Sequence, residues 1–314
     1  MHAGPVGVAG EYEPPGPLAE PLLTQVSGLG EDDGAGSSGG WQTTSRRLSK
    51  RREYVKLSVV MAVHNGQETI EQAVEEVLSV DYPCDVEVLI VDDGSTDKTP
   101  DILAQITDPR VVMIRHGGNR GYGAAFAAAV TAATGTHILP FHAELEYLPD
   151  DILSLLEPVL TGRCEVVYGV RLFGYNTVYR SYRYALGKSV FTLATNLLFG
   201  SCLSDAHTCL KLIPANLLRS LDIRETGFGL NTEIGAVLLR RGVRPFEVPV
   251  SYFSRADHDD KYMTWRDAVR CLWILFRVRV QPQRSVSSAG PHGSADLHGP
   301  SELTQSFTWL GLRS

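Results

Sequence analysis

The sequence predicts an α/β protein in which helices flank a mostly parallel, Rossmann-like sheet. Unbroken apolar runs, typical of strands buried on both faces, alternate with segments whose apolar residues recur at helical spacing. Strands and helices that alternate at these lengths indicate βαβ units, in which the crossover is almost always right-handed. We therefore expect a single folded domain built around this sheet.

The predicted elements follow one another over the first half of that domain. Four apolar runs are expected to be strands: Leu57–Val63, Val86–Val91, Val111–Arg115 and Thr136–Phe141. The segments between them are expected to be helices: Gln67–Val80, Thr99–Ile106 and Gly121–Ala133. The last of these is rich in alanine, which lets a helix pack closely on a sheet.

The two ends of the chain differ from this pattern. Residues 1–52 are dense in Gly, Pro, Ser and acidic residues, and residues 283–314 in Ser, Gly, Pro and His, so both segments are expected to be disordered. Residues 53–282 form the expected domain. A basic run at residues 46–52 is either a solvated linker or a contact with anionic lipid headgroups.

Composition narrows the possible functions. The formal net charge is −7 and the pI is about 5.7, so the global basic footprint of a nucleic-acid-binding protein is absent. No apolar stretch reaches the roughly 20 residues of a membrane span, and the N-terminus lacks the pattern of a secretory signal. Five cysteines without a CxxC pair indicate reduced thiols. We expect a cytoplasmic protein.

Polar or glycine-rich clusters follow all four predicted strands. They are His64-Asn65-Gly66, Asp92–Thr99, Gly117–Gly123 and His142-Ala143-Glu144. In open α/β sheets, ligands bind beyond the carboxyl ends of the strands. The carboxylates of Asp92 and Asp93 can accept hydrogen bonds from a base edge or from ribose hydroxyls. A plain turn is the alternative interpretation of Asp93-Gly94.

Three segments resemble the nucleotide-sugar half of family 2 glycosyltransferases: Ser58–Asn65, Val91–Thr99 and Asn119–Ala124. Four later segments resemble the polyprenyl-phosphate (dolichol-phosphate mannosyltransferase-like) branch of that family: Leu145–Asp151, Glu165–Arg171, Ser204–Lys211 and Glu247–Arg255. The resemblance extends from about Tyr54 to Val280. It implies a GT-A fold and an inverting transfer of a sugar from a nucleotide-diphosphate sugar to a lipid-linked phosphate.

The resemblance also implies the residues of the site. The donor would be bound by Ala62, His64, Asn65, Asp92, Asp93, Asn119 and Gly121. The acceptor phosphate would be bound by Arg171, Arg183, Arg255 and Lys261, because cationic groups, and the guanidinium fork above all, suit phosphate. Direct catalytic roles would fall to Arg171, Asp205 and Glu233. The alternatives are surface arginines, and carboxylates that cap a helix or support another group.

The metal motif departs from the family pattern. Relatives usually have Asp-x-Asp after the fourth strand, where this chain has His142 and Glu144, with Glu146 nearby. The resemblance implies Mg²⁺ or Mn²⁺ at these three residues. Glutamate is a good ligand for either ion, whereas histidine suits Mn²⁺ better than Mg²⁺. Three outcomes stay open: an altered metal preference, weak or metal-independent activity, or nucleotide binding without catalysis. Glu146 is otherwise a solvated loop carboxylate.

Two segments could form helices that contact a membrane. Ser189–Phe199 and Thr264–Val280 have the composition of peripheral helices at the inner face of a membrane, or of amphipathic helices packed on the domain.

A family 2 enzyme that uses a hydroxyl acceptor is the second functional hypothesis, and a weakened nucleotide-sugar-binding protein is the third. A nucleotidyltransferase is disfavoured, because no basic glycine-rich loop follows the first strand.

Overall fold

The structure is a computed structural model that describes residues 55–172, 177–178, 182–227, 229–253 and 265–281. These residues belong to one compact unit. The two expected disordered segments lie outside the described residues. All five cysteines lie among the described residues, and all are free thiols.

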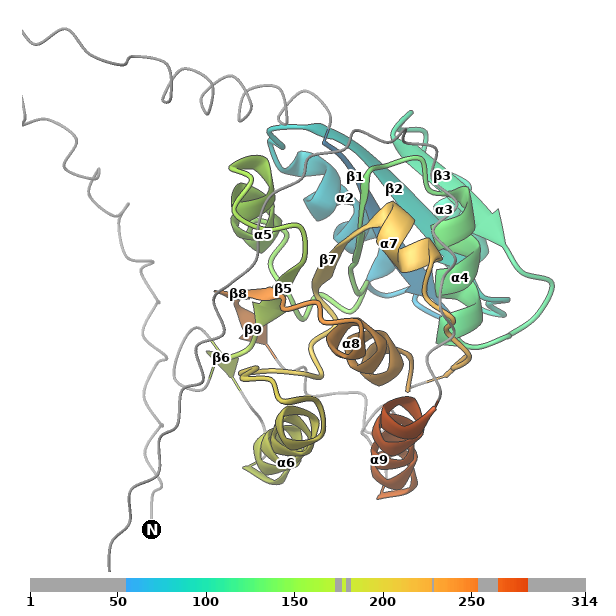
Figure 1. The fold of residues 1–314 in the computed structure, drawn as a ribbon. Helices are drawn as coiled ribbons and strands as arrows, with labels where there is room; N and C mark the ends of the chain where they lie inside the picture. The colour runs from blue at the N-terminus through green and yellow to red at the C-terminus, as the bar shows by residue number, and fades with distance from the viewer. Residues whose placement is uncertain (1–54, 173–176, 179–181, 228, 254–264, 282–314) are drawn as a thin grey trace, which may run out of the picture. The chain divides into compact units, whose positions relative to one another are not determined.

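The core of the fold is a seven-stranded sheet in the order β3-β2-β1-β4-β7-β5-β8 (Figure 1). Its strands are β1 Lys56–Val63, β2 Asp85–Asp92, β3 Val111–Arg115, β4 His137–Pro140, β5 Val167–Val170, β7 Lys211–Pro214 and β8 Phe246–Pro249. All neighbouring pairs are parallel except those made by β7, which runs antiparallel to β4 and β5. Strands β6 (Thr177–Val178) and β9 (Tyr252–Phe253) form a separate parallel pair.

Helices cover both faces of this sheet, and two further helices pack against one of them. The helices are α2 Ile70–Ser79, α3 Thr99–Leu103, α4 Tyr122–Ala132, α5 Asp151–Leu160, α6 Tyr182–Phe199, α7 Ala215–Arg219, α8 Leu230–Arg240 and α9 Trp265–Val280. The two further helices are α6 and α9, and both pack against α8. Along β1, Val59 and Met61 belong to one hydrophobic cluster and Val60 to another, as side chains that alternate across a strand must. The first cluster includes α2 and α5, and the second includes α4, α7 and α8.

The expected elements of the first half are all present, and the mostly parallel α/β architecture is confirmed. Helix α2 begins at Ile70, three residues later than expected. Its entry is delayed because Asn65 adopts a left-handed φ of 53° and the N–H of Gln67 donates to the Asp97 carboxylate (3.2 Å). No helix among the described residues is long and apolar enough to cross a membrane.

The antiparallel strand β7 was not expected, and it matters for the site. The register pairs His137 with Pro214, so β7 begins near the carboxyl end of β4. The segment before β7, which contains Asp205 and Cys209, therefore starts at the same edge where β1, β2 and β4 end. Strand β5 is again parallel to β4 and delivers Arg171 to this edge as well.

Candidate active site

Asp93 holds the loop that follows β3. Its carboxylate accepts hydrogen bonds from His116 Nδ1 (2.7 Å), Arg120 N (3.0 Å) and Gly121 N (2.7 Å). Burial opposes the charge, but these bonds, that from His116 first, lower the pKa of Asp93 below its usual value. Asn119, on the exposed tip of the same loop, accepts a second bond from Gly121 N (3.0 Å). The carboxylate of Asp93 thus fixes backbone that lies beside the predicted donor site.

Asp92 keeps one oxygen without a hydrogen bond. Its Oδ1 accepts from Ser95 N (2.8 Å). Its Oδ2 lies 3.3 Å from Arg115 Nε as an ion-pair contact, yet accepts no hydrogen bond although it is buried. A buried acceptor in this state costs free energy unless a ligand supplies a donor. Asp92 is therefore better placed than Asp93 to bind a hydroxyl or a base N–H.

The loop after β1 is tied to the loop after β2. Asn65 N donates to Ser95 Oγ (2.9 Å), and Asn65 Oδ1 accepts from Thr96 N (2.9 Å). His64 is exposed, with Nδ1 3.1 Å from the carbonyl oxygen of Asp93. Ala62 lies within β1, opposite Val91 of β2. The structure therefore brings the predicted donor residues together at the ends of β1 and β2 and on the loop after β3.

Two glycine loops pack backbone to backbone at this edge. Gly94 has a φ of 74°, and a Cβ there would lie 2.5 Å from the backbone of Gly118. Gly121 has a φ of 91°, and a Cβ on it would lie 2.7 Å from the carbonyl oxygen of Thr226. That same oxygen accepts a hydrogen bond from Gly123 N (2.8 Å). The predicted donor loop therefore rests directly on the segment that precedes α8.

Arg171 and Asp205 form a buried, two-pronged ion pair. Arg171 Nε lies 2.7 Å from Asp205 Oδ2, and Nη2 lies 3.1 Å from Oδ1. Lys188 Nζ lies 3.4 Å from the same carboxylate and donates to the carbonyl oxygen of Arg171 (2.5 Å). Burial would raise the pKa of Asp205, but Arg171 lowers it to about 2. Asp205 therefore stays ionised and orients the guanidinium, which also stacks over the ring of Tyr252.

Glu233 is buried on α8 and is fully engaged. Its Oε2 accepts from the backbone N–H groups of Arg224 and Glu225, both at 2.8 Å. Its Oε1 accepts from Arg277 Nη2 of α9 at 2.6 Å. These contacts are those of a carboxylate that supports neighbouring backbone, which is the alternative to a direct catalytic role.

His142 lies at the end of β4 with its ring edge-on to Tyr122. Its Nδ1 is 3.8 Å from Glu144 Oε2, and its buried Nε2 has no hydrogen-bond partner. Burial lowers the pKa of His142, but Cys209 and then Glu144 and Glu146 outweigh it and raise the pKa. Burial raises the pKa of Glu146.

Comparison with known proteins identifies the family. The sequence model of glycosyl transferase family 2 matches residues 58–220, which is 163 of 314 residues and thus more than half of the chain. The chain belongs to glycosyl transferase family 2.

Curated relatives share part of the chain. The low-salt glycan biosynthesis hexosyltransferase Agl6 of Haloferax volcanii is 28% identical over 207 residues, which cover 63% of this chain and 48% of the relative. Glycosyltransferase AglD of the same organism is 26% identical over 226 residues, covering 69% and 36%. An Escherichia coli relative is named UDP-Glc:alpha-D-GlcNAc-diphosphoundecaprenol beta-1,3-glucosyltransferase WfaP; it is 37% identical over 82 residues, covering 26% and 32%. The chain spans about half or less of the length of these relatives.

Solved structures show the same fold. Glucosyl-3-phosphoglycerate synthase from Mycobacterium tuberculosis in complex with UDP superposes with a TM-score of 0.58 at 19% identity, covering 76% of this chain and 85% of that one. The same synthase with Mn²⁺, UDP-glucose and phosphoglyceric acid gives a TM-score of 0.57 at 18% identity, covering 79% and 87%. At this identity the likeness shows the fold alone. The chain has the GT-A fold.

Some predicted residues cannot be placed. Arg255 and Lys261 lie outside the described residues, and Arg183 lies on α6 with a side chain that is not described. In the part of the chain that the structure describes, no three His, Cys, Asp or Glu side chains are grouped to hold a metal ion. His142 and Glu144 approach each other, but Glu146 does not complete a set of three.

One residue of the site was not anticipated. The cysteines were predicted only to be reduced thiols, yet Cys209 Sγ lies 3.3 Å from Tyr147 Oη and interacts with His142. Burial raises the pKa of the Cys209 thiol, but the neighbouring His142 outweighs it and lowers that pKa. No local signal in the sequence pointed to this contact, because it depends on the direction of β7.

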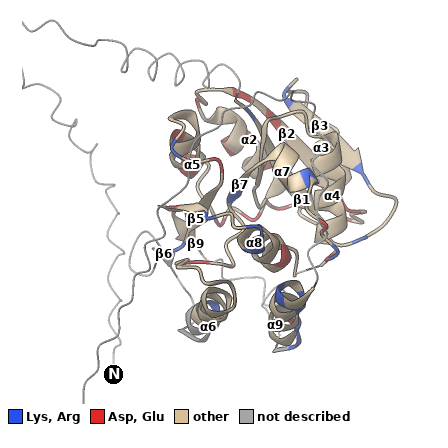
Figure 2. Ribbon diagram, in the orientation of Figure 1, with Lys and Arg blue, Asp and Glu red and all other residues tan. Residues whose placement is uncertain are grey.

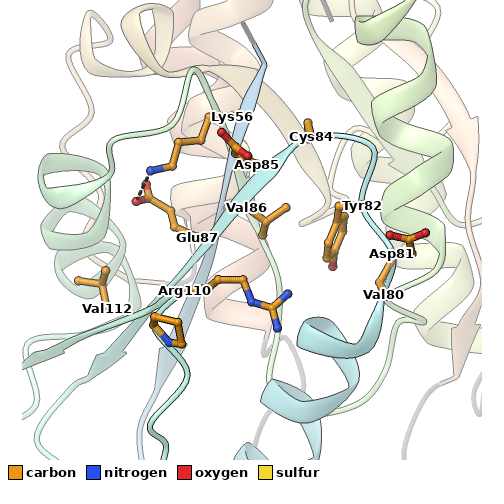
Figure 3. Close-up of a pocket in the computed structure, with 11 residues that line it drawn as sticks. Lys56, Val80, Asp81, Tyr82, Cys84, Asp85, Val86, Glu87, Arg110 and Val112 are labelled. Atoms are coloured by element: carbon orange, nitrogen blue, oxygen red, sulfur yellow. Dashed lines mark ion pairs between the residues drawn. The ribbon is translucent and has the colours of Figure 1, made fainter. Parts of the chain in front are cut away.

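An open groove of about 500 Å³ lies at the opposite edge of the sheet (Figure 3). Charged groups of both signs line it, among them Arg110 and the ion pair of Lys56 with Glu87 (3.3 Å). These residues stand at the starts of strands, whereas the predicted site residues follow strand ends. We therefore do not assign this groove to the transfer reaction.

Proposed function

We propose that the enzyme transfers a hexosyl group, with inversion, from a nucleotide-diphosphate sugar to a polyprenyl-phosphate-type acceptor. The observation that carries this proposal is the fixed Arg171 guanidinium at the carboxyl end of β5. Arg171 and Lys188 converge on one carboxylate, Asp205, so these three groups have a formal charge of +1. A cationic group of this kind at the reaction edge suits an acceptor phosphate. The name of WfaP gives a lipid-linked acceptor, GlcNAc-diphosphoundecaprenol, and so supports the lipid-linked part of the proposal; its beta-1,3 linkage is made to a sugar hydroxyl and not to a phosphate.

The donor would bind at the ends of β1 and β2. The unfilled Oδ2 of Asp92 would accept a hydrogen bond from the base or from a ribose hydroxyl. The loop held by Asp93 would bring the backbone near Asn119 and Gly121 close to the nucleotide. His64 and Asn65 would close the site from the β1 side. Asp93 thus contributes by positioning the loop.

The transfer step needs no strong base. An oxygen of the acceptor phosphate attacks the anomeric carbon as the bond from that carbon to the diphosphate breaks, and the nucleoside diphosphate leaves. A phosphate acceptor is already ionised at neutral pH, so no proton must be removed from it. Negative charge grows on the leaving oxygens, and fixed positive groups at this edge stabilise it.

His142 and Glu144 fit a divalent cation only in part. The unpartnered Nε2 of His142 and the nearby carboxylate of Glu144 offer two ligands, so diphosphate oxygens would have to complete the shell. Such an ion would neutralise the leaving diphosphate. An imidazole ligand favours Mn²⁺ over Mg²⁺. Glu146 would support the ion from the same loop.

We also propose that the enzyme works at the cytoplasmic face of a membrane, with α6 and α9 as its contact. Val190, Leu193 and Leu197 form an exposed stripe on α6, and Leu197 is 77% exposed. An exposed stripe on α9 consists of Val269, Leu272, Trp273, Phe276 and Val280. The two helices are neighbours, since Arg279 of α9 donates to the carbonyl oxygen of Leu198 (2.9 Å), and Ala194 and Leu198 of α6 pack against the cluster that contains Ile274 and Val278 of α9.

Charge on α9 favours an anionic lipid surface as the partner. Its basic residues are Arg266, Arg270, Arg277 and Arg279, whereas Asp267 is its one acidic residue (Figure 2). At 100° per residue, Arg266 lies on one side of the apolar stripe and Arg279 on the other, whereas Arg270 and Arg277 pair with Glu225 and Glu233. An apolar stripe between cationic borders is typical of a helix that lies in the headgroup region.

Turnover of defined donors tests the proposed reaction. The full chain would be incubated with GDP-mannose, UDP-glucose or UDP-GlcNAc, under Mg²⁺, Mn²⁺ or EDTA, with a short polyprenyl phosphate or the matching polyprenol. We expect nucleoside diphosphate release to rise with the phosphate and not with the alcohol. Arg171→Lys should raise the KM for the lipid phosphate at least tenfold, because one ammonium cannot reproduce the guanidinium fork. Release that rises equally with the alcohol would favour a hydroxyl acceptor.

A second candidate is a nucleotide-sugar-binding protein without turnover. The observation that favours it is the lack of a three-ligand metal group among the described residues. Donor binding by calorimetry, combined with no nucleoside diphosphate release under any metal, would support this candidate and contradict the transfer reaction.

A further inference from the structure

We propose that Arg277 of α9 is a positioning residue for the donor nucleotide, although it lies outside the site. The proposal rests on the proposed donor site and concerns how its glycine loop is held. The contacts that carry it run from α9 through Glu233 and Glu225 to Thr226, and from there to Gly121 and Gly123.

The first step is an ion-pair cluster that joins α9 to Glu233 of α8 and to Glu225, which precedes α8. Arg277 lies 2.6 Å from Glu233 Oε1 and 3.4 Å from Glu225 Oε1, and Arg270 lies 2.8 Å from Glu225 Oε2. Both carboxylates are almost fully buried, at 3% and 7% side-chain exposure. A buried carboxylate that loses its cation is strongly destabilised, so these two need the arginines of α9. Arg277 is the one that contacts both.

The second step leads from the carboxylates to backbone. Glu233 Oε2 accepts hydrogen bonds from the N–H groups of Arg224 and Glu225, both at 2.8 Å. These two bonds fix the chain just before Thr226. The segment is otherwise irregular, because α8 begins only at Leu230. Its position therefore depends on Glu233, which in turn depends on Arg277.

The third step reaches the donor loop. The carbonyl oxygen of Thr226 accepts from Gly123 N (2.8 Å). A Cβ on Gly121 or Gly123 would lie 2.7 Å or 2.4 Å from the carbonyl oxygens of Thr226 or Glu225, so the two backbones are in direct contact. Gly121 N also donates to Asp93. The loop is thus held by hydrogen bonds to the Asp93 carboxylate and by contact with the backbone of residues 225–226. Arg277 fixes the position of residues 225–226 through Glu233 and Glu225.

Arg277→Gln tests the proposal, with Arg279→Gln as the matched control on the same helix. Arg279 donates to the carbonyl oxygen of Leu198 and not to a glutamate. We expect Arg277→Gln to weaken binding of UDP or GDP, measured by calorimetry, at least tenfold. The kcat at saturating donor should change less than threefold. Arg277→Lys should recover at least a third of the lost affinity, and Arg279→Gln should leave it unchanged.

Amide hydrogen exchange gives a readout that needs neither donor nor acceptor. In Arg277→Gln, exchange at Gly121 and Gly123 should become at least tenfold faster, while exchange in β1 stays as in the wild type. A lower melting temperature with unchanged nucleotide affinity and unchanged exchange at the loop would show a merely structural role and overturn the proposal. A fall in kcat at unchanged nucleotide affinity would also overturn it. Because nucleotide binding and exchange are measured without acceptor, failure of the proposed transfer reaction is distinguishable from failure of this inference.

Discussion

Asp92 and Asp93 are neighbours at the end of β2, but their carboxylates do different things. Asp93 accepts hydrogen bonds from His116, Arg120 and Gly121, which occupy both of its oxygens. Asp92 has a buried oxygen that accepts none. Stability and nucleotide affinity should therefore respond differently when each residue is changed to asparagine.

Asp93→Asn should lower the free energy of unfolding by about 2 kcal/mol, because both carboxylate oxygens accept hydrogen bonds and asparagine keeps only one acceptor oxygen. Asp92→Asn should leave stability within about 1 kcal/mol of the wild type and weaken UDP or GDP binding about tenfold, which corresponds to about 1.4 kcal/mol. Denaturant unfolding and calorimetry measure the two quantities. Equal losses of stability in both variants would contradict the different roles.

The proposed preference for Mn²⁺ over Mg²⁺ also depends on single residues. Replacing His142 and Glu144 together by aspartate restores the usual Asp-x-Asp pattern of hard oxygen ligands. We expect the ratio of transfer rates in Mg²⁺ and Mn²⁺ to rise at least tenfold in this variant, since Mg²⁺ prefers oxygen ligands. Glu144→Asp alone is the control, because it keeps the imidazole. An unchanged ratio in the double variant would show that neither residue binds the ion.

At the level of elements, α6 and α9 form the proposed membrane contact. Trp273→Ser combined with Phe276→Ser should reduce co-sedimentation with vesicles of 30% anionic lipid at least tenfold, because both side chains are more than half exposed and would enter the headgroup region. Binding should weaken as salt rises. The vesicles contain no acceptor, so the assay is independent of catalysis.

A matched control lies on the edge strand β3. Val112→Ser with Met113→Ser removes exposed apolar surface of similar kind at a distance from both helices, and should leave vesicle binding unchanged. Equal loss in both double variants would show that the α6–α9 face is not the contact. Dimerisation that disappears only in the Trp273 variant would identify a second copy of the chain as the partner instead.

The sequence predicted the elements of the first half well, because each depends on local apolar spacing. It also located the strand ends at which Asp92, Asp93, His142 and Glu144 stand. It did not predict that β7 is antiparallel, since strand direction depends on which neighbours pair and not on local pattern. The contact of Cys209 with His142 follows from that direction and was missed for the same reason.

The role of Glu233 was harder to predict for a similar reason. A glutamate in the first turn of a helix near the acceptor side fits a catalytic acid as well as a support for backbone. Its ion pair with Arg277 joins residues that are 44 positions apart. Only the packing of α9 on α8 brings them together, and no spacing in the sequence indicates that packing.

At the scale of the whole molecule, the edge where the parallel strands end and the edge where they start carry different groups of residues. The predicted site residues gather at the carboxyl edge. At the opposite edge, Glu87 accepts hydrogen bonds from Ser58, Thr134 and Gly135 and pairs with Lys56. These contacts join β1, β2 and the turn before β4, so Glu87 should matter for the stability of the whole fold and little for binding.

The pH dependence of unfolding tests this role. Burial opposes the charge of Glu87, but its hydrogen bonds, that from Ser58 first, lower its pKa from 4.5 to about 2. Because the folded pKa is the lower one, the stabilisation is fully present above about pH 5 and is lost as the pH falls toward 2. We expect Glu87→Gln to lower the free energy of unfolding by on the order of 2 kcal/mol at pH 7, after allowance for solvent screening.

The difference between Glu87→Gln and the wild type should shrink steadily between pH 5 and pH 2 in urea titrations. Glu75→Gln, an exposed residue on α2, is the control and should change stability by less than about 0.5 kcal/mol at either pH. Nucleotide affinity should be unchanged in both variants. A pH-independent difference would contradict the ionised role of Glu87.

The bond from Gly123 to Thr226 also has a consequence for synthesis on the ribosome. The donor loop and the segment that supports it are separated by roughly 100 residues, which take about 5–20 s to translate at typical rates. During that interval the nascent chain exposes a glycine-rich loop without its lateral support. The loop can therefore gain this hydrogen bond only after residues 225–226 have been made.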